Sequence, residues 1–86
     1  MGSFVDARER RGDVVADVCV IGGGAAGISV ALELAGGPRG VTLLEAGGDQ
    51  LDPEYQELYR AKQVGLRTDT LQHNRWRVFG GTTGHW

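Results

Sequence analysis

The chain has 86 residues, so it forms at most one small domain with a modest hydrophobic core. Hydrophobic residues make up 41% of it, too many for a disordered tail, and its 15 glycines cluster without a collagen-like period. The net charge of −2 gives no overall electrostatic case for a nucleic-acid partner. The single cysteine, Cys19, excludes an internal disulfide and a cysteine-cluster metal site. Because valines flank it, we predict a small buried side chain.

Residues 1–13 are polar and rich in arginine, and we expect them to form a flexible N-terminal arm ahead of residues 14–86. Paired arginines before a semi-apolar run are typical of an export signal, but Asp13 and Asp17 interrupt that run and Glu33 ends it. The sequence therefore predicts neither a signal peptide nor a membrane span, and it predicts a cytoplasmic location.

The next segment carries the pattern of a βαβ unit. Residues 16–22, "ADVCVIG", form a short apolar run that a glycine ends, which favours a buried strand. Residues 24–35 follow with helical periodicity, and Gly36 is predicted to cap that helix in a left-handed conformation shortly before Pro38. Residues 41–45, "VTLLE", predict a second strand. Strand, helix and strand in this order predict an α/β fold with parallel strands and a right-handed crossover.

The second half of the chain is less regular. Asp52 is suited to cap a helix and Pro53 to occupy its first turn, and the apolar spacing predicts a helix that ends near Gly65. From there to Arg75 the pattern gives no clear assignment. Residues 75–79, "RWRVF", alternate and are predicted to be extended.

The turn after the first strand has the spacing G-x-G-x-x-G, which is typical of dinucleotide binding when a strand precedes it and a helix follows. Gly22 allows the tight exit from the strand, Gly24 lets a pyrophosphate approach the backbone, and Gly27 lets the helix lie close to the strand. The helix N-terminus offers free N–H groups to phosphate. The candidate cofactor-binding residues of this turn are Gly22, Gly24, Ala26 and Gly27.

Glu45 ends the second strand, 18 residues after Gly27. A carboxylate at this point can accept hydrogen bonds from the hydroxyl groups of an adenosine ribose, and it would repel a 2′-phosphate, which disfavours NADP. The alternative is a solvent-exposed glutamate at a strand end. With the glycine spacing upstream, the ribose interpretation is preferred, and the choice between FAD and NAD stays open at this point.

Three segments together, "DVCVIGGGAAG", "LLEAGG" and "RVFGGTTGHW", resemble the glucose–methanol–choline (GMC) family of FAD-dependent oxidoreductases. The resemblance is strongest to bacterial choline-dehydrogenase-like and pyranose oxidase-like members. It covers about residues 14–86 and matches only the N-terminal part of much longer proteins. It implies an incomplete Rossmann-like FAD-binding domain, made of the βαβ unit, the following helix and a second flavin-contact segment. The further cofactor-binding residues that it implies are Glu45, Ala46, Gly80, Gly81, Thr82, Thr83 and His85.

In pyranose oxidase-like relatives, a histidine before a tryptophan at this spacing carries the flavin through a covalent bond, and His85 matches that position. The sequence departs from the pattern at Gly84, where relatives commonly carry threonine or asparagine. The alternative is a histidine that packs near the flavin ring without a bond to it.

The resemblance implies oxidation of an alcohol or sugar CH–OH group by hydride transfer to FAD. The family's histidine base lies near the C-terminal end of the full protein, and no residue here matches it, so we expect no catalytic residue and no metal site in this chain. The expected partners are the alcohol or sugar substrate and the remainder of the oxidoreductase, as further chain or as a partner subunit. Two alternatives stay open: a non-catalytic nucleotide-binding or interaction module, and the NAD domain of a dehydrogenase, which "LEAGG" disfavours.

Overall fold

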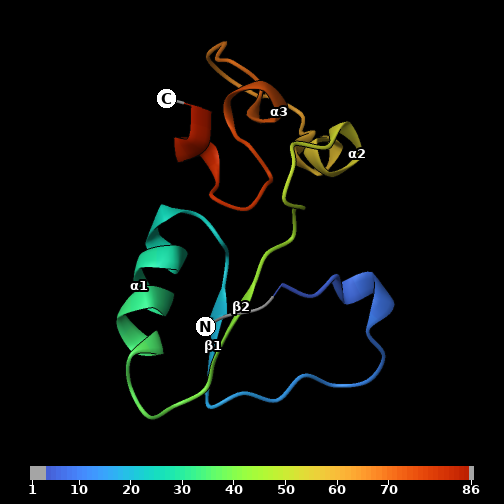
Figure 1. Ribbon diagram of the computed structural model, residues 1–86. Coiled ribbons are helices and arrows are strands. Elements are labelled where there is room, and N and C mark those ends of the chain that lie inside the picture. The colour runs from blue at the N-terminus through green and yellow to red at the C-terminus, as the bar shows by residue number, and fades with distance from the viewer. Residues whose placement is uncertain (1–3, 86) are drawn as a thin grey trace.

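The computed structural model describes residues 4–85, except for the side chains of Gln72 and His85. The first half of the chain contains a short 3-10 turn, two strands and the longest helix (Figure 1). These elements are η1 (Ala7–Glu9), β1 (Val18–Ile21), α1 (Ala25–Ala35) and β2 (Val41–Leu44). The second half contains α2 (Pro53–Gln56), η2 (Glu57–Tyr59), α3 (Leu71–Asn74) and η3 (Thr82–His85).

The two strands form a parallel sheet in which Val18 pairs with Val41 and Ile21 with Leu44. Val20 lies beneath α1, because a Cβ placed on Gly27 of that helix would lie 3.5 Å from its side chain. Helix α1 connects the strands and packs against them, as Figure 1 shows. The predicted α/β arrangement, a βαβ unit with parallel strands, is confirmed.

The other face of this sheet is open among the described residues. Side chains alternate along β1, so Cys19 and Ile21 point away from the face on which Val20 meets α1. Cys19 is exposed, and Ile21 and its partner Leu44 are 83% and 42% exposed. The prediction that Cys19 is buried was therefore wrong, because strand alternation places it on the uncovered face.

The end of α1 also differs from its prediction. Gly36 has φ −78° and ψ −8°, which is right-handed, and not the left-handed cap that the sequence predicted. The N–H groups of Gly36 and Gly37 both donate to the carbonyl of Leu34, so a tight right-handed turn satisfies this helix end before Pro38.

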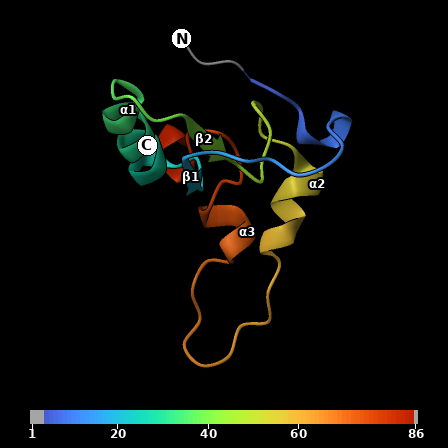
Figure 2. The same cartoon turned by 90° about the horizontal axis from the view of Figure 1, so that it is seen from below.

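Helix α2 begins where it was predicted and ends early. Asp52 caps it by accepting a 2.8 Å hydrogen bond from the N–H of Glu54, and Pro53 occupies its first turn. The predicted continuation to Gly65 was wrong, since the helix tightens into η2 and the chain is extended at Arg60. The loop that follows projects from the rest of the chain (Figure 2), and its Leu66 is 93% exposed. A helix there would have no surface on which to bury an apolar face, and short helices depend on such packing.

The described residues enclose little core. The buried hydrophobic residue among them is Val78, which is 8% exposed and forms a parallel bridge with Gly48 within the segment predicted to be extended. The accessible surface is 7339 Å², whereas a compact protein of this mass exposes about 4,900 Å². The radius of gyration is 15.1 Å, against about 12 Å for a compact domain of this length.

Within the described part of the chain, no helix is long and apolar enough to cross a membrane.

Candidate nucleotide-binding site

Three glycine-containing turns meet at the carboxyl end of the two strands, and we call this meeting point the glycine junction. It consists of Gly22–Gly24 after β1, Gly47–Gly48 after β2, and Gly80–Gly81 before η3. Backbone hydrogen bonds join the third turn to the other two: the N–H of Gly80 donates to the carbonyl of Gly23 at 2.7 Å, and the N–H of Phe79 donates to that of Gly48 at 2.9 Å. In Figure 1 the C-terminal segment accordingly lies over the end of α1 and β1.

The first turn has the geometry that its three glycines require. Gly22 has φ +106°, a conformation that costs other residues free energy. A Cβ on Gly27 would lie 1.8 Å from the carbonyl oxygen of Gly22, so the helix backbone touches the turn. A Cβ on Gly24 would meet nothing within 4 Å, so this position faces open space.

The N-terminus of α1 is free to receive an anion. Gly24 is its N-cap and supplies no side-chain hydrogen bond, and no described protein group accepts from the N–H groups of Ala25 and Ala26. Unpaired N–H groups and the positive end of the helix dipole both favour negative charge at this point. The space beside the Cα of Gly24 is open as well, so nothing described there would block a phosphate group that approaches the turn.

Glu45 links the first two turns. One oxygen of its half-buried carboxylate, Oε1, accepts a hydrogen bond from the N–H of Gly23 at 3.1 Å, and Oε2 accepts one from the N–H of Gly47 at 2.9 Å. A carboxylate has further acceptor capacity on both oxygens, so these bonds are compatible with a ribose contact. The ribose contact itself stays a prediction. Ala46, the next residue, is exposed.

Glycine is also required where the terminal segment meets the other turns. Gly80 and Gly81 have φ +96° and +70°, and a Cβ on Gly81 would lie 3.0 Å from the Cα of Gly24. A Cβ on Gly47 would lie 2.1 Å from the carbonyl oxygen of Arg77. The second and third turns therefore pack backbone against backbone.

The two threonines after this glycine pair hold the terminal segment in its own turn. Thr82 Oγ1 accepts from the N–H of Trp76 at 3.0 Å, and Thr83 Oγ1 donates to the carbonyl of Gly80 at 3.0 Å. Their predicted contacts with a flavin stay predictions. His85 is the last residue of η3, and its side chain lies outside the described residues.

One residue at this site was not identified from the sequence. Gln56 of α2 uses its side-chain amide to hold the segment before Gly80: Oε1 accepts from the N–H of Arg77 at 3.1 Å, and Nε2 donates to the carbonyl of Arg75. No local pattern marks Gln56, because its partners lie about 20 residues further along the chain.

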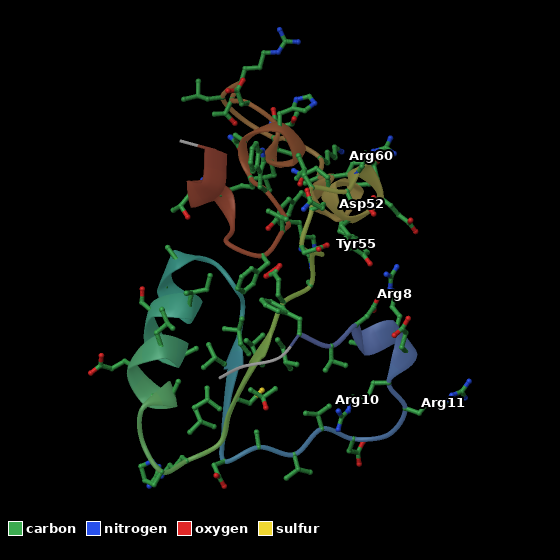
Figure 3. The ribbon with its side chains drawn as sticks, viewed as in Figure 1. Arg8, Arg10, Arg11, Asp52, Tyr55 and Arg60 are labelled. Atoms are coloured by element: carbon green, nitrogen blue, oxygen red, sulfur yellow. The ribbon has the colours of Figure 1, made fainter. Side chains whose placement is uncertain are left out.

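The N-terminal segment brings a charged pair close to α2. Hydrogen bonds from the side chain and the backbone N–H of Arg8 lower the pKa of Asp6 to about 2. The Asp6 carboxylate in turn raises the pKa of Arg8, with smaller contributions from Tyr55 and Asp52, which lie near it in Figure 3. Asp6 also caps η1, so this part of the predicted flexible arm contains a local turn.

Other features of the described residues lie away from the glycine junction. His73 pairs its Nδ1 with Thr70 Oγ1 at 2.8 Å at the start of α3, and it is exposed. Among the side chains that the structure describes, no group of three His, Cys, Asp or Glu could hold a metal ion. A hollow of about 290 Å³ lies at the opposite end of the sheet, lined by residues 15–17 and 40–42.

Comparison with protein families matches residues 17–51 to the family described as FAD dependent oxidoreductase. The match includes β1, α1, β2 and the first two turns of the glycine junction. Neither the curated proteins nor the solved structures gave a significant match. The match supports an FAD-binding βαβ segment of a flavin-dependent oxidoreductase, and it covers less than half of the chain.

Proposed function

We propose that this chain is the FAD-binding part of an oxidoreductase that acts on CH–OH groups of alcohols or sugars. The observation that carries the proposal is the glycine junction: the N–H groups at the α1 N-terminus have no described acceptor, a Cβ on Gly24 would meet open space, and the carboxylate of Glu45 bonds the same turn. The family match over residues 17–51 supports FAD, and the resemblance to the GMC family supports the substrate class.

The residues present fit a dinucleotide. The N–H group of Ala26 would bind the pyrophosphate, because no described protein group accepts from it, and the open space beside Gly24 would let the pyrophosphate approach the backbone. Glu45 would accept hydrogen bonds from the ribose hydroxyl groups, and its negative charge would exclude a 2′-phosphate. The segment from Gly80 to Thr83 would lie toward the flavin end. When bound, FAD supplies the acceptor for a hydride.

Two features extend this proposal. His85 would attach the flavin covalently, on the strength of its position before Trp86 at the spacing seen in pyranose oxidase-like relatives. The base that takes the proton of the substrate hydroxyl would come from the remainder of the oxidoreductase, as further chain or as a partner subunit, since no residue of this chain matches the family's catalytic histidine.

The proposal is tested by titrating the purified chain with FAD, NAD and NADP and following flavin fluorescence and calorimetric heat. FAD should bind and NADP should not. Binding of NAD with no binding of FAD would contradict the flavin assignment. Binding of none of the three would favour the alternative, an interaction module without a cofactor.

A further inference from the structure

The side-chain amide of Gln56 takes the place of a strand peptide. It accepts from the N–H of Arg77 at 3.1 Å and donates to the carbonyl of Arg75, and these two groups flank Trp76. In a parallel ladder, one residue bonds the two backbone groups that flank the residue opposite to it. Gln56 therefore gives the segment before the glycine pair a partner that the sheet itself does not supply there.

This contact continues a ladder that the backbone forms further along. Val78 and Gly48 form a parallel bridge, and the next two N–H groups, of Phe79 and Gly80, donate to Gly48 and Gly23. A slip by one residue in one direction would place Thr82 where Gly81 lies, and its Cβ would be 3.0 Å from the Cα of Gly24. A slip in the other direction would place Phe79 where Gly80 lies, at a φ of +96° that disfavours any residue with a side chain. The glycine pair therefore fits the first turn in one register.

The position of Gln56 is itself determined by local structure. Asp52 and Pro53 start α2, and the N–H of Gln56 donates to the carbonyl of Asp52 at 2.9 Å. The contact needs one donor and one acceptor at the end of a side chain of this length. Glutamine supplies both, whereas an ionised glutamate of the same shape only accepts, and methionine has no donor and only a weak sulfur acceptor.

We infer that Gln56 is a positioning residue that fixes the register of residues 75–81, and so sets how Gly80–Gly81 lie on the first turn at the flavin end of the site. The inference rests on the proposed function for its effect on FAD. Its effect on the register of the terminal segment is independent of any cofactor.

The test compares Gln56→Met and Gln56→Glu with Gln63→Met, a matched change at an exposed glutamine of the loop. Amide hydrogen exchange is measured by NMR at Arg77, with the N–H of Gly22 as an internal reference because it donates to Leu44 in the β1–β2 sheet. Relative to Gly22, exchange at Arg77 should rise about tenfold in Gln56→Met, the factor expected when a hydrogen bond worth about 1.4 kcal/mol is lost. It should rise less in Gln56→Glu, which keeps the acceptor, and stay unchanged in Gln63→Met.

Affinities for FAD and ADP then separate positioning from general destabilisation. Gln56→Met should weaken FAD about tenfold and ADP less than twofold, because ADP lacks the flavin end of the ligand. Equal losses for both ligands, or an unchanged FAD affinity, would overturn the positioning role. An unchanged Arg77-to-Gly22 exchange ratio would overturn the register role.

If Gln56→Met unfolds, the milder Gln56→Glu gives the same comparison. Failure of the unaltered chain to bind FAD would refute the proposed function, while the exchange ratio would still decide the register.

Discussion

Alanine at Gly27 should separate helix α1 from the first turn, whereas alanine at Gly24 should leave the fold intact and impair the cofactor site. The new Cβ at Gly27 would lie 1.8 Å from the carbonyl oxygen of Gly22. To reach ordinary contact, the helix and the turn must move apart by about 1.5 Å. The neighbour is backbone, so no flexible side chain can yield to the new methyl group.

The magnitude follows from two opposing contributions. Overpacking against a rigid neighbour costs about 3 kcal/mol or more, and replacing a glycine inside a helix by alanine returns about 1 kcal/mol. The net loss of unfolding free energy at Gly27 is therefore about 2 kcal/mol or more. A chain of this length is stabilised by only about 4 kcal/mol at the low end of the usual range, where its small core places it. Gly27→Ala should thus lose a large part of its stability.

Gly24→Ala is the matched control for this loss. Its Cβ would meet nothing within 4 Å and the backbone has φ −83°, so the only expected cost is that of alanine at an N-cap, about 1 kcal/mol or less. The methyl group would instead occupy the open space beside Gly24, where we propose that the pyrophosphate lies. Gly24→Ala should therefore weaken FAD at least tenfold, which corresponds to about 1.4 kcal/mol, and Gly24→Val should weaken it further.

Urea unfolding followed by far-ultraviolet circular dichroism measures the first effect, and an FAD titration at low urea measures the second. A Gly27→Ala chain as stable as the unaltered one would refute the close contact between helix and turn. A Gly24→Ala chain with unchanged FAD affinity would refute the placement of the pyrophosphate.

Three further predictions concern side chains. Glu45→Ala should weaken FAD by about 1–3 kcal/mol, because hydrogen bonds to a charged acceptor are lost, and an unchanged titration would count against the ribose contact. If His85 carries the flavin, acid denaturation of the FAD-loaded protein should leave the yellow flavin on the polypeptide, and the same treatment of His85→Ala should release the flavin. Free flavin from the unaltered protein would show that no bond exists. The pKa of Asp6 is lowered to about 2, so its contribution to folding is present above its unfolded pKa of 3.8 and is lost as the pH falls toward 2. Carboxyl-carbon NMR should show this low pKa, and Arg8→Ala should return it toward 3.8, whereas an unchanged value would mean that Arg8 is not the cause.

The sequence by itself determined the elements whose signals are local. Both strands and α1 follow from short apolar runs, helical spacing and the glycines between them, and the start of α2 follows from Asp52 and Pro53. The tight turn at Gly22 and the close contact at Gly27 were predictable for the same reason. Each depends on steric and hydrogen-bonding preferences within a few residues, which the chain carries wherever it lies.

Only the tertiary structure decided which surfaces and which distant groups meet. Strand alternation separates Cys19 from Val20, but which of the two is covered depends on where α1 packs. The side-chain amide of Gln56 and the carboxylate of Glu45 each bond a backbone group about 20 residues away in the chain. The early end of α2 reflects the lack of a surface on which a longer helix could pack. Such contacts depend on chain closure and on the burial of groups distant in sequence, so no local pattern contains them.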